Sequence, residues 1–198
     1  MKRYYSSTTV PEEYFDVLGM IENINYNRRT NYLKRGIRWC LDSGGFSREF
    51  NEETWKWYVK NCVEFKDTCD FVVIPDVVYD YKATLDRFFK FNDFVKNLGF
   101  KCSFVTQDGM PDEEIPWSLF DVLFIGGSNE HKLGLGTKVT IDLAKQEHKK
   151  VHIGRVNSIK RIEMFKDCDS WDGTHLGFYP ADKKRFANYV RSLNEINS

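Results

Sequence analysis

The sequence predicts an α/β fold in which a parallel sheet closes into a compact (β/α) barrel of the TIM type, with reduced helices. Short apolar runs alternate with helical patterns along the chain, which is typical of parallel strands joined by right-handed crossovers. No glycine-rich dinucleotide or P-loop signature follows any strand, which disfavours the alternative of an open doubly wound sheet. The chain has 198 residues. That is short for a closed barrel, so some helices must be missing or reduced.

Seven short apolar runs are predicted to be strands. They are Lys2–Ser6, Ile37–Leu41, Phe71–Ile74, Lys101–Val105, Val122–Ile125, Val151–Ile153 and Cys168–Trp171.

Helices are predicted between these runs from their caps and apolar stripes. Asn51 is a suitable N-cap for a helix with Glu52 and Glu53 in its first turn, and a longer helix begins near Tyr81 and ends at Gly99. Further helices are expected at Thr140–His148, at Ser158–Phe165, and in a last segment with Phe186, Tyr189, Val190 and Leu193 on one stripe.

The composition indicates one globular domain over residues 1–198, with 41% hydrophobic and 16% aromatic residues. Lys plus Arg and Asp plus Glu both total 29, so a nucleic-acid site would have to be a local basic patch. The five cysteines lack zinc-ligand spacing and are odd in number, which fits a reducing cytosol. With no apolar run of signal-peptide or membrane-span length, we expect a soluble, cytoplasmic protein without membrane contact.

The predicted strands end in acids, amides or glycine pairs, at the edge where parallel β/α folds place their chemistry. Any one of these motifs can be explained as a turn or a helix entry. Their shared location favours a site. The motifs are Asp42-Ser43-Gly44-Gly45-Phe46, Pro75-Asp76, Thr106-Gln107-Asp108-Gly109, Gly126-Gly127-Ser128, Gly154-Arg155, and Asp169-Ser170 with Asp172 close behind.

In order and type these motifs resemble those of tRNA-guanine transglycosylases, and most closely those of their reduced phage relatives. These relatives are the DpdA-type enzymes, which put 7-deazaguanines into DNA. The resemblance covers about Ile37 to Trp171 and includes Asp42-Ser-Gly-Gly-Phe46, Phe124-Ile-Gly-Gly127 and Cys168-Asp-Ser170. Ser47 stands where the tRNA enzymes usually have Gln, and their Cys-x-Cys-x-x-Cys…His zinc site is absent. The resemblance therefore implies exchange of guanine in DNA for a 7-deazaguanine of the preQ0 type, in a flipped or melted site.

The resemblance also assigns roles to residues. Asp169 would be the nucleophile that forms a covalent aspartyl-sugar intermediate, with Asp172 as the alternative, and Asp42 would be the acid or base. Asp76 would accept hydrogen bonds from the guanine edge, and Gln107 and the Gly127 N–H would meet its O6 side. The remaining base contacts would come from Ser43, Gly45, Phe46, Gly126 and Ile153.

Two other functions stay open at this point: the same chemistry on tRNA, and a non-catalytic nucleic-acid-binding subunit. No step needs a metal or a redox cofactor. The four histidines lie on different elements without carboxylates at ligand spacing, so no metal site is predicted. His152 and Arg155 are instead candidates for phosphate contacts.

Overall fold

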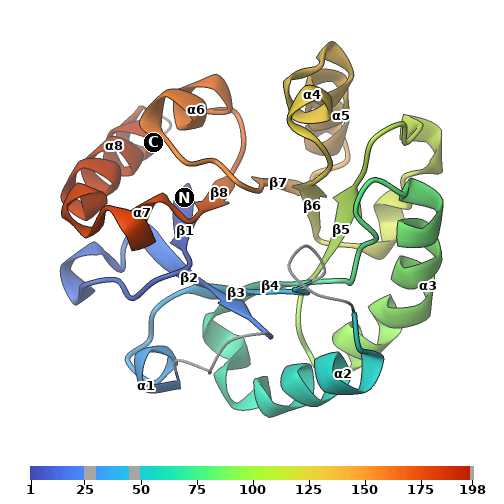
Figure 1. Ribbon diagram of the computed structural model, residues 1–198, viewed down its shortest axis with the longest axis horizontal. Coiled ribbons are helices and arrows are strands. Elements are labelled where there is room, and N and C mark those ends of the chain that lie inside the picture. The colour runs from blue at the N-terminus through green and yellow to red at the C-terminus, as the bar shows by residue number, and fades with distance from the viewer. Residues whose placement is uncertain (25–29, 45–49, 197–198) are drawn as a thin grey trace.

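The described residues of the computed structural model (1–24, 30–44 and 50–196) form a closed barrel of eight parallel strands (Figure 1). Each strand pairs with the next along the chain, and β8 pairs with β1 to close the ring. The predicted α/β barrel is therefore confirmed. The strands are β1 (Arg3–Ser6), β2 (Leu18–Asn23), β3 (Trp39–Asp42), β4 (Cys69–Val73), β5 (Cys102–Thr106), β6 (Val122–Ile125), β7 (Lys150–Ile153) and β8 (Ser170–Gly173).

The helices around the barrel are uneven in length, as a short chain requires. Only a 3₁₀ turn at Glu12–Tyr14 lies between β1 and β2, and two 3₁₀ turns, Asp112–Glu114 and Trp117–Leu119, replace a helix between β5 and β6. Two more 3₁₀ segments are Val63–Thr68 and Pro180–Asp182. The α-helices are α1 (Thr30–Leu33), α2 (Glu52–Asn61), α3 (Tyr81–Asn97), α4 (Asn129–Leu133), α5 (Leu135–Gln146), α6 (Ile159–Met164), α7 (His175–Phe178) and α8 (Lys183–Glu195).

Local capping explains where the predicted helices begin and end. Asn51 caps α2 by accepting the Thr54 N–H at 2.8 Å, and Asp80 caps α3 by accepting the Ala83 N–H at 3.0 Å. Gly99, with φ +84°, follows the end of α3. By contrast, α5 begins at Leu135 rather than Thr140. Thr137 in its first turn is buried, and its hydroxyl donates to the His131 carbonyl at 2.5 Å.

The strands β1, β3, β4, β5 and β7 differ from their predicted bounds by one or two residues at one or both ends, and only β6 has the predicted bounds. Two strands differ in ways that matter for the site. The segment β2 was not predicted, since it follows a short 3₁₀ turn rather than a helix. The last strand, β8, lies two residues later than the predicted Cys168–Trp171. Its pairing with β1, with Arg3 opposite Ser170 and Ser6 opposite Gly173, sets this register.

The core has two layers. Between the barrel and its helices lie side chains such as Tyr4, which packs on Phe186 of α8 with ring centroids 5.0 Å apart. Inside the barrel lies a smaller cluster of Tyr5, Cys40, Phe71, Val73, Val105 and Val122, with Ile21 and Phe124 against it. Since side chains alternate along a strand, neighbours such as Tyr4 and Tyr5 belong to different layers.

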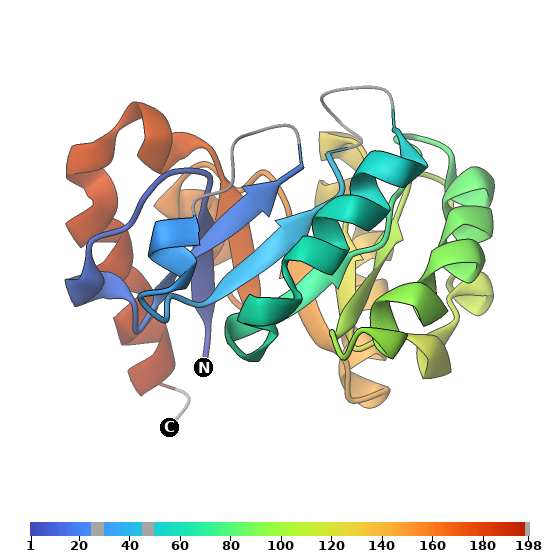
Figure 2. The ribbon, with the colours of Figure 1, turned by 90° about the horizontal axis from the view of Figure 1, so that it is seen from below.

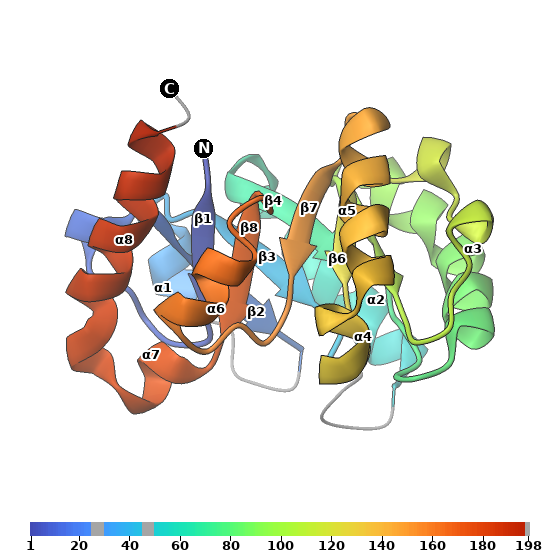
Figure 3. The same cartoon turned by 90° about the horizontal axis from the view of Figure 1, so that it is seen from above.

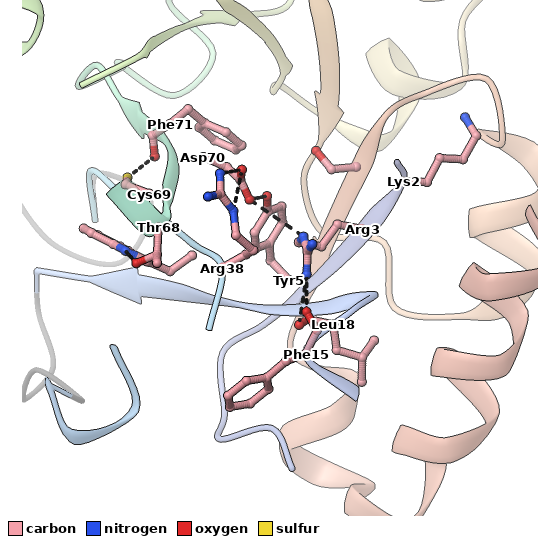
Figure 4. A network of polar contacts seen from close by, with 12 residues as sticks. Lys2, Arg3, Tyr5, Phe15, Leu18, Arg38, Thr68, Cys69, Asp70 and Phe71 are labelled. Carbon is pink, nitrogen blue, oxygen red and sulfur yellow. Dashed lines mark hydrogen bonds and ion pairs between the residues drawn. The ribbon is translucent and has the colours of Figure 1, made fainter. Parts of the chain in front are cut away.

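The strands all point toward one end of the barrel, while the first residues of the chain and the last turn of α8 lie at the other (Figures 2 and 3). Asp70 links three side chains at this amino end (Figure 4). It accepts the Tyr5 hydroxyl at 2.5 Å and two hydrogen bonds from the Arg38 guanidinium, and Arg3 lies 3.8 Å away. None of the helices in the described part of the chain is long and apolar enough to cross a membrane.

Candidate active site

A cavity of about 880 Å³ opens at the carboxyl end of the barrel. Its walls are apolar in part, with Ile21, Val73, Val105 and Phe124 rising from the barrel interior. Polar groups from nearly every strand end reach the same space, as expected for a β/α barrel. They are Asn23, Asp42, Asp76, Gln107, Lys132, Arg155, Asn157 and Asp172.

Asp42 is the last residue of β3, and its carboxyl group lines the cavity. Asn23, at the end of β2, donates to its Oδ2 at 2.7 Å. Burial raises the pKa of Asp42 to about 7, and the negative charges of Asp76 and Asp172 add to this shift. At neutral pH the group is therefore divided between its acid and its carboxylate forms, as a proton carrier requires.

Asp76, in the loop after β4, is held from two sides. Ser43 Oγ donates to Oδ1 at 3.2 Å, and Gln107 Nε2 donates to Oδ2 at 2.7 Å. Gln107 is itself oriented, because its Oε1 accepts the Tyr79 N–H at 3.0 Å. Burial raises the pKa of Asp76, while these hydrogen bonds oppose the rise.

Asp172, near the end of β8, is bound to a histidine inside the barrel. His152 Nε2 lies 2.9 Å from Asp172 Oδ2, and His152 Nδ1 lies 2.8 Å from Ser170 Oγ. The imidazole is fully buried and lies among the rings of Tyr5, Phe71 and Phe124. Asp172 Oδ1 also accepts the Arg155 N–H at 3.2 Å, so both of its oxygens have fixed partners.

Two cationic side chains, Lys132 and Arg155, also line the cavity, on the side where Asp172 lies. Lys132 of α4 is only 5% exposed, and its ammonium donates to the Gly154 carbonyl at 2.7 Å. Burial and the nearby charge of Arg155 lower the pKa of Lys132 to about 8. Arg155 has φ +61°, a backbone conformation that costs free energy in a non-glycine residue, and its guanidinium donates to the Gly127 carbonyl.

Seven residues that were selected from the sequence line this one cavity: Asp42, Asp76, Gln107, Gly126, Gly127, the alternative nucleophile Asp172 and the candidate phosphate contact Arg155. The two glycines lie where a side chain would not fit, since a Cβ on Gly126 would be 2.6 Å from the Thr106 carbonyl oxygen. A Cβ on Gly127, which has φ +73°, would be 2.5 Å from Asp108 Oδ2. Gly45 and Phe46 lie outside the described residues.

The placement of Asp169 beside Asp42 is wrong. Asp169 precedes β8, and its Oδ2 accepts the Val151 N–H at 2.8 Å. It lines a separate cavity of about 350 Å³ at the amino end of the barrel, with Arg3 and Asp70. The two-residue shift of β8 is the reason, because it moves Asp169 to the start of the strand and Asp172 to its end.

Three further assignments need correction. Ile153 is fully buried in the layer between the barrel and the helices, so it cannot cover a ligand in the cavity. Ser43 is buried too, and it contacts Asp76 rather than lining the space. The predicted phosphate contact of His152 is also wrong, because its imidazole is fully buried inside the barrel and bonded to Ser170 and Asp172.

The sequence analysis missed Asn23, Lys132 and Asn157. Asn23 had a usable signal, because the run Leu18–Asn23 ends in an amide like other strand ends. Lys132 had no such signal. It lies in the polar helix α4, and only the tertiary structure places its side chain in the cavity wall. In the ranges that the structure describes, no three His, Cys, Asp or Glu side chains are grouped to hold a metal ion.

Comparison with known proteins yields fold relatives only. No protein-family model matches the chain, and no curated protein matches it. A variant of the tryptophan synthase alpha-subunit from Pyrococcus furiosus is similar at a TM-score of 0.51 and 11% identity, over 98% of this chain and 93% of that one. A protein from Aquifex aeolicus VF5 is similar at a TM-score of 0.50 and 11% identity, over 85% of this chain and 69% of that one. At these identities the likeness shows the barrel fold alone.

These findings overturn the transglycosylase prediction, both for DNA and for tRNA. No family model and no curated protein supports it, and the tryptophan synthase alpha-subunit that is similar in structure shares only the barrel fold with this chain. The residue that the resemblance assigned as nucleophile, Asp169, lies at the end of the barrel away from Asp42. Because the transglycosylase activity is rejected, the guanine-binding roles predicted for Asp76, Gln107 and Gly127 lose their basis. Contact with a nucleic acid stays an untested prediction.

Proposed function

We propose that this protein is an enzyme that acts on a small polar molecule by acid–base catalysis at the mouth of the barrel. The observation that carries the proposal is the set of three carboxyl groups, Asp42, Asp76 and Asp172, in one cavity, with the pKa of Asp42 near 7. A buried carboxyl group that titrates near neutral pH is typical of catalytic acids and bases.

The contacts of each carboxyl group suggest different roles. Asp42 carries the proton, because its pKa is raised to about 7. Asp76 is held by Ser43 and Gln107 and offers fixed acceptor oxygens to N–H or O–H groups of a substrate. Asp172, bound to His152 and to the Arg155 N–H, faces the substrate from the far side of the barrel.

The charges favour a substrate with two unlike ends. Hydrogen-bond donors of the substrate are favoured near Asp42 and Asp76, and an acceptor or anionic group near Lys132 and Arg155. The cavity volume of about 880 Å³ is in the range of sites for small molecules and cofactors. A proton transfer next to a carbonyl group, an elimination or a hydrolysis would all fit these groups.

The test combines a titration with an exchange assay. The ¹³C shift of the Asp42 carboxyl carbon should titrate near pH 7 and identifies the proton carrier. Keto acids, hydroxy acids, amides and lactams are then incubated with the protein in D₂O, and NMR follows deuterium uptake, elimination and hydrolysis. For the compounds that react, Asp42→Asn should lower the reaction rate by about 10²–10⁴-fold.

Asp93→Asn on the exposed face of α3 is the matched control, because it makes the same chemical change away from the cavity. It should leave the rate as it is. An Asp42 carboxyl group that titrates near pH 4, together with turnover that Asp42→Asn does not change, would contradict the proposal.

A further inference from the structure

Lys132 is a buried amine to which the proposed function gives only an electrostatic role. Its side chain lies in the wall of the cavity, where the backbone of α4 ends and the loop after β7 begins. Lysine is rarely buried without a carboxylate partner. Here the bond to the Gly154 carbonyl fixes the Nζ atom at 2.7 Å without neutralising its charge.

We propose that Lys132 forms an imine with a small carbonyl compound that carries an anionic group, such as a 2-keto acid, in the cavity at the carboxyl end of the barrel. This inference rests on the proposed function, because it places the same substrate in the same cavity and names its chemical class.

Three observations support an amine that reacts as a nucleophile. Lys132 lines the cavity of about 880 Å³, so its side chain lies next to the space that a substrate would occupy. The cationic Arg155 lines the same space and would attract the anionic group of a keto acid. The pKa of Lys132 is lowered to about 8, first by burial and then by Arg155, against the opposing charges of Asp172 and Asp108.

The lowered pKa decides the reactivity at neutral pH, since only the uncharged amine attacks a carbonyl carbon. With a pKa of about 8, roughly a tenth of the Lys132 amine is uncharged at pH 7. For an ordinary lysine the fraction is about 1 in 2,500. A difference of this size separates a nucleophilic lysine from a surface lysine.

The step balances without an oxidant or a reductant. The Nζ lone pair attacks the carbonyl carbon, and the carbonyl oxygen takes up a proton to give a carbinolamine. The nitrogen then loses a proton, the hydroxyl group takes up another, and water leaves as the C=N bond forms. Asp42, which lines the same cavity and titrates near pH 7, can give and take these protons.

Reductive trapping tests the inference directly. The full-length protein is incubated at pH 7.5 with pyruvate and sodium cyanoborohydride, which reduces an imine to a stable secondary amine. Peptide mass spectrometry then gives the rate of modification at each lysine. Acetone serves as the uncharged counterpart of pyruvate, and it should label Lys132 more slowly if Arg155 attracts the anion.

The chain provides a matched control lysine in Lys2. Its ammonium also donates to a backbone carbonyl, that of Cys168, at 2.8 Å, and burial also lowers its pKa. Lys2 lies at the amino end of the barrel, far from the cavity. We expect Lys132 to be labelled by pyruvate at least about tenfold faster than Lys2. Labelling of Lys132 no faster than Lys2 would overturn the inference.

Lys132→Arg separates this inference from the proposed function. It keeps a cation beside Gly154 but removes the nucleophilic amine, so the adduct should disappear while the thermal unfolding midpoint stays close to that of the original protein. Exchange that depends on Asp42, with Lys132 unlabelled, would overturn only the imine. If Lys132 is labelled but the turnover rate is the same in Asp42→Asn as in the original protein, only the acid–base proposal is overturned.

Discussion

Asp169 and Asp172 lie at opposite ends of the same strand, although only two residues separate them. Asp169 precedes β8 and accepts the Val151 N–H at the amino end, whereas Asp172 lies in the large cavity and is bound to His152. A strand rises by about 3.3 Å per residue, so the two carboxyl groups are on the order of 10 Å apart along the barrel. The same substitution should therefore have different effects at the two positions.

Asp172→Asn should lower the pKa of Asp42, because the charge of Asp172 is one of the causes that raise it. Asp169→Asn should leave that pKa unchanged, since Asp169 is not among those causes and lies at the other end of the barrel. The ¹³C titration of the Asp42 carboxyl carbon in the two variants measures both effects. Equal shifts in both variants would contradict the separation of the two ends.

Asp42 should make the protein less stable as the pH rises from about 4 to about 7. Its pKa is raised from 3.8 to about 7 in the folded state, so the folded state binds the extra proton in this range. The stabilisation is present below pH 3.8 and is lost as the pH passes through 7. A shift of about three pKa units corresponds to roughly 4 kcal/mol. We expect the free energy of unfolding to fall by only about 2 kcal/mol, because the side chain is partly exposed.

Urea unfolding of the original protein and of Asp42→Asn between pH 4 and pH 8 checks this expectation. The free energy of unfolding of the variant should rise relative to the original protein as the pH increases. A constant difference over the whole range would show that Asp42 has an ordinary pKa.

Asp172 should fix which nitrogen of the His152 imidazole carries hydrogen, and Ser170 should bind the other nitrogen. Because Asp172 accepts a hydrogen bond at Nε2, a neutral imidazole carries its proton there and accepts the Ser170 hydroxyl at Nδ1. ¹⁵N NMR of labelled histidine should show the Nε2–H form. Ser170→Ala should move the Nδ1 resonance away from its hydrogen-bonded position, while an Nδ1–H form in the original protein would contradict this geometry.

Gly154→Ala should disturb the cavity wall. A Cβ at this position would be 2.9 Å from the Phe124 ring and 3.1 Å from Asp172 Oδ2. Gly136→Ala in α5 is the control, because a Cβ there has no atom within 4 Å and alanine favours a helix by about 1 kcal/mol. Thermal unfolding should show a lower midpoint for Gly154→Ala and an unchanged or higher one for Gly136→Ala.

Tyr5→Phe should destabilise the amino end of the barrel without affecting the candidate site. The substitution removes the 2.5 Å hydrogen bond from the Tyr5 hydroxyl to Asp70, which costs about 1–2 kcal/mol, and leaves Arg38 bound to Asp70. Urea unfolding measures this loss. The pKa of Asp42 should be the same as in the original protein, and a shift would show that the two ends of the barrel are coupled.

Much of the fold could be predicted from the sequence because it rests on local chemistry. Asn51 capped a helix, Gly99 followed the end of one, and the run Val122–Ile125 matched β6. The sequence also placed Asp42, Asp76 and Gln107 at strand ends, and in a parallel barrel strand ends meet. By itself, then, the sequence determined the fold class and half of the cavity wall.

Only the tertiary structure decided the rest, because register and reach depend on contacts between distant segments. The pairing of β8 with β1 moved Asp169 to one end and Asp172 to the other, and a shift of two residues along a strand is invisible to apolar patterning. In the same way, burial beside Gly154 and Arg155 turned Lys132, one lysine among many, into an amine with a pKa of about 8.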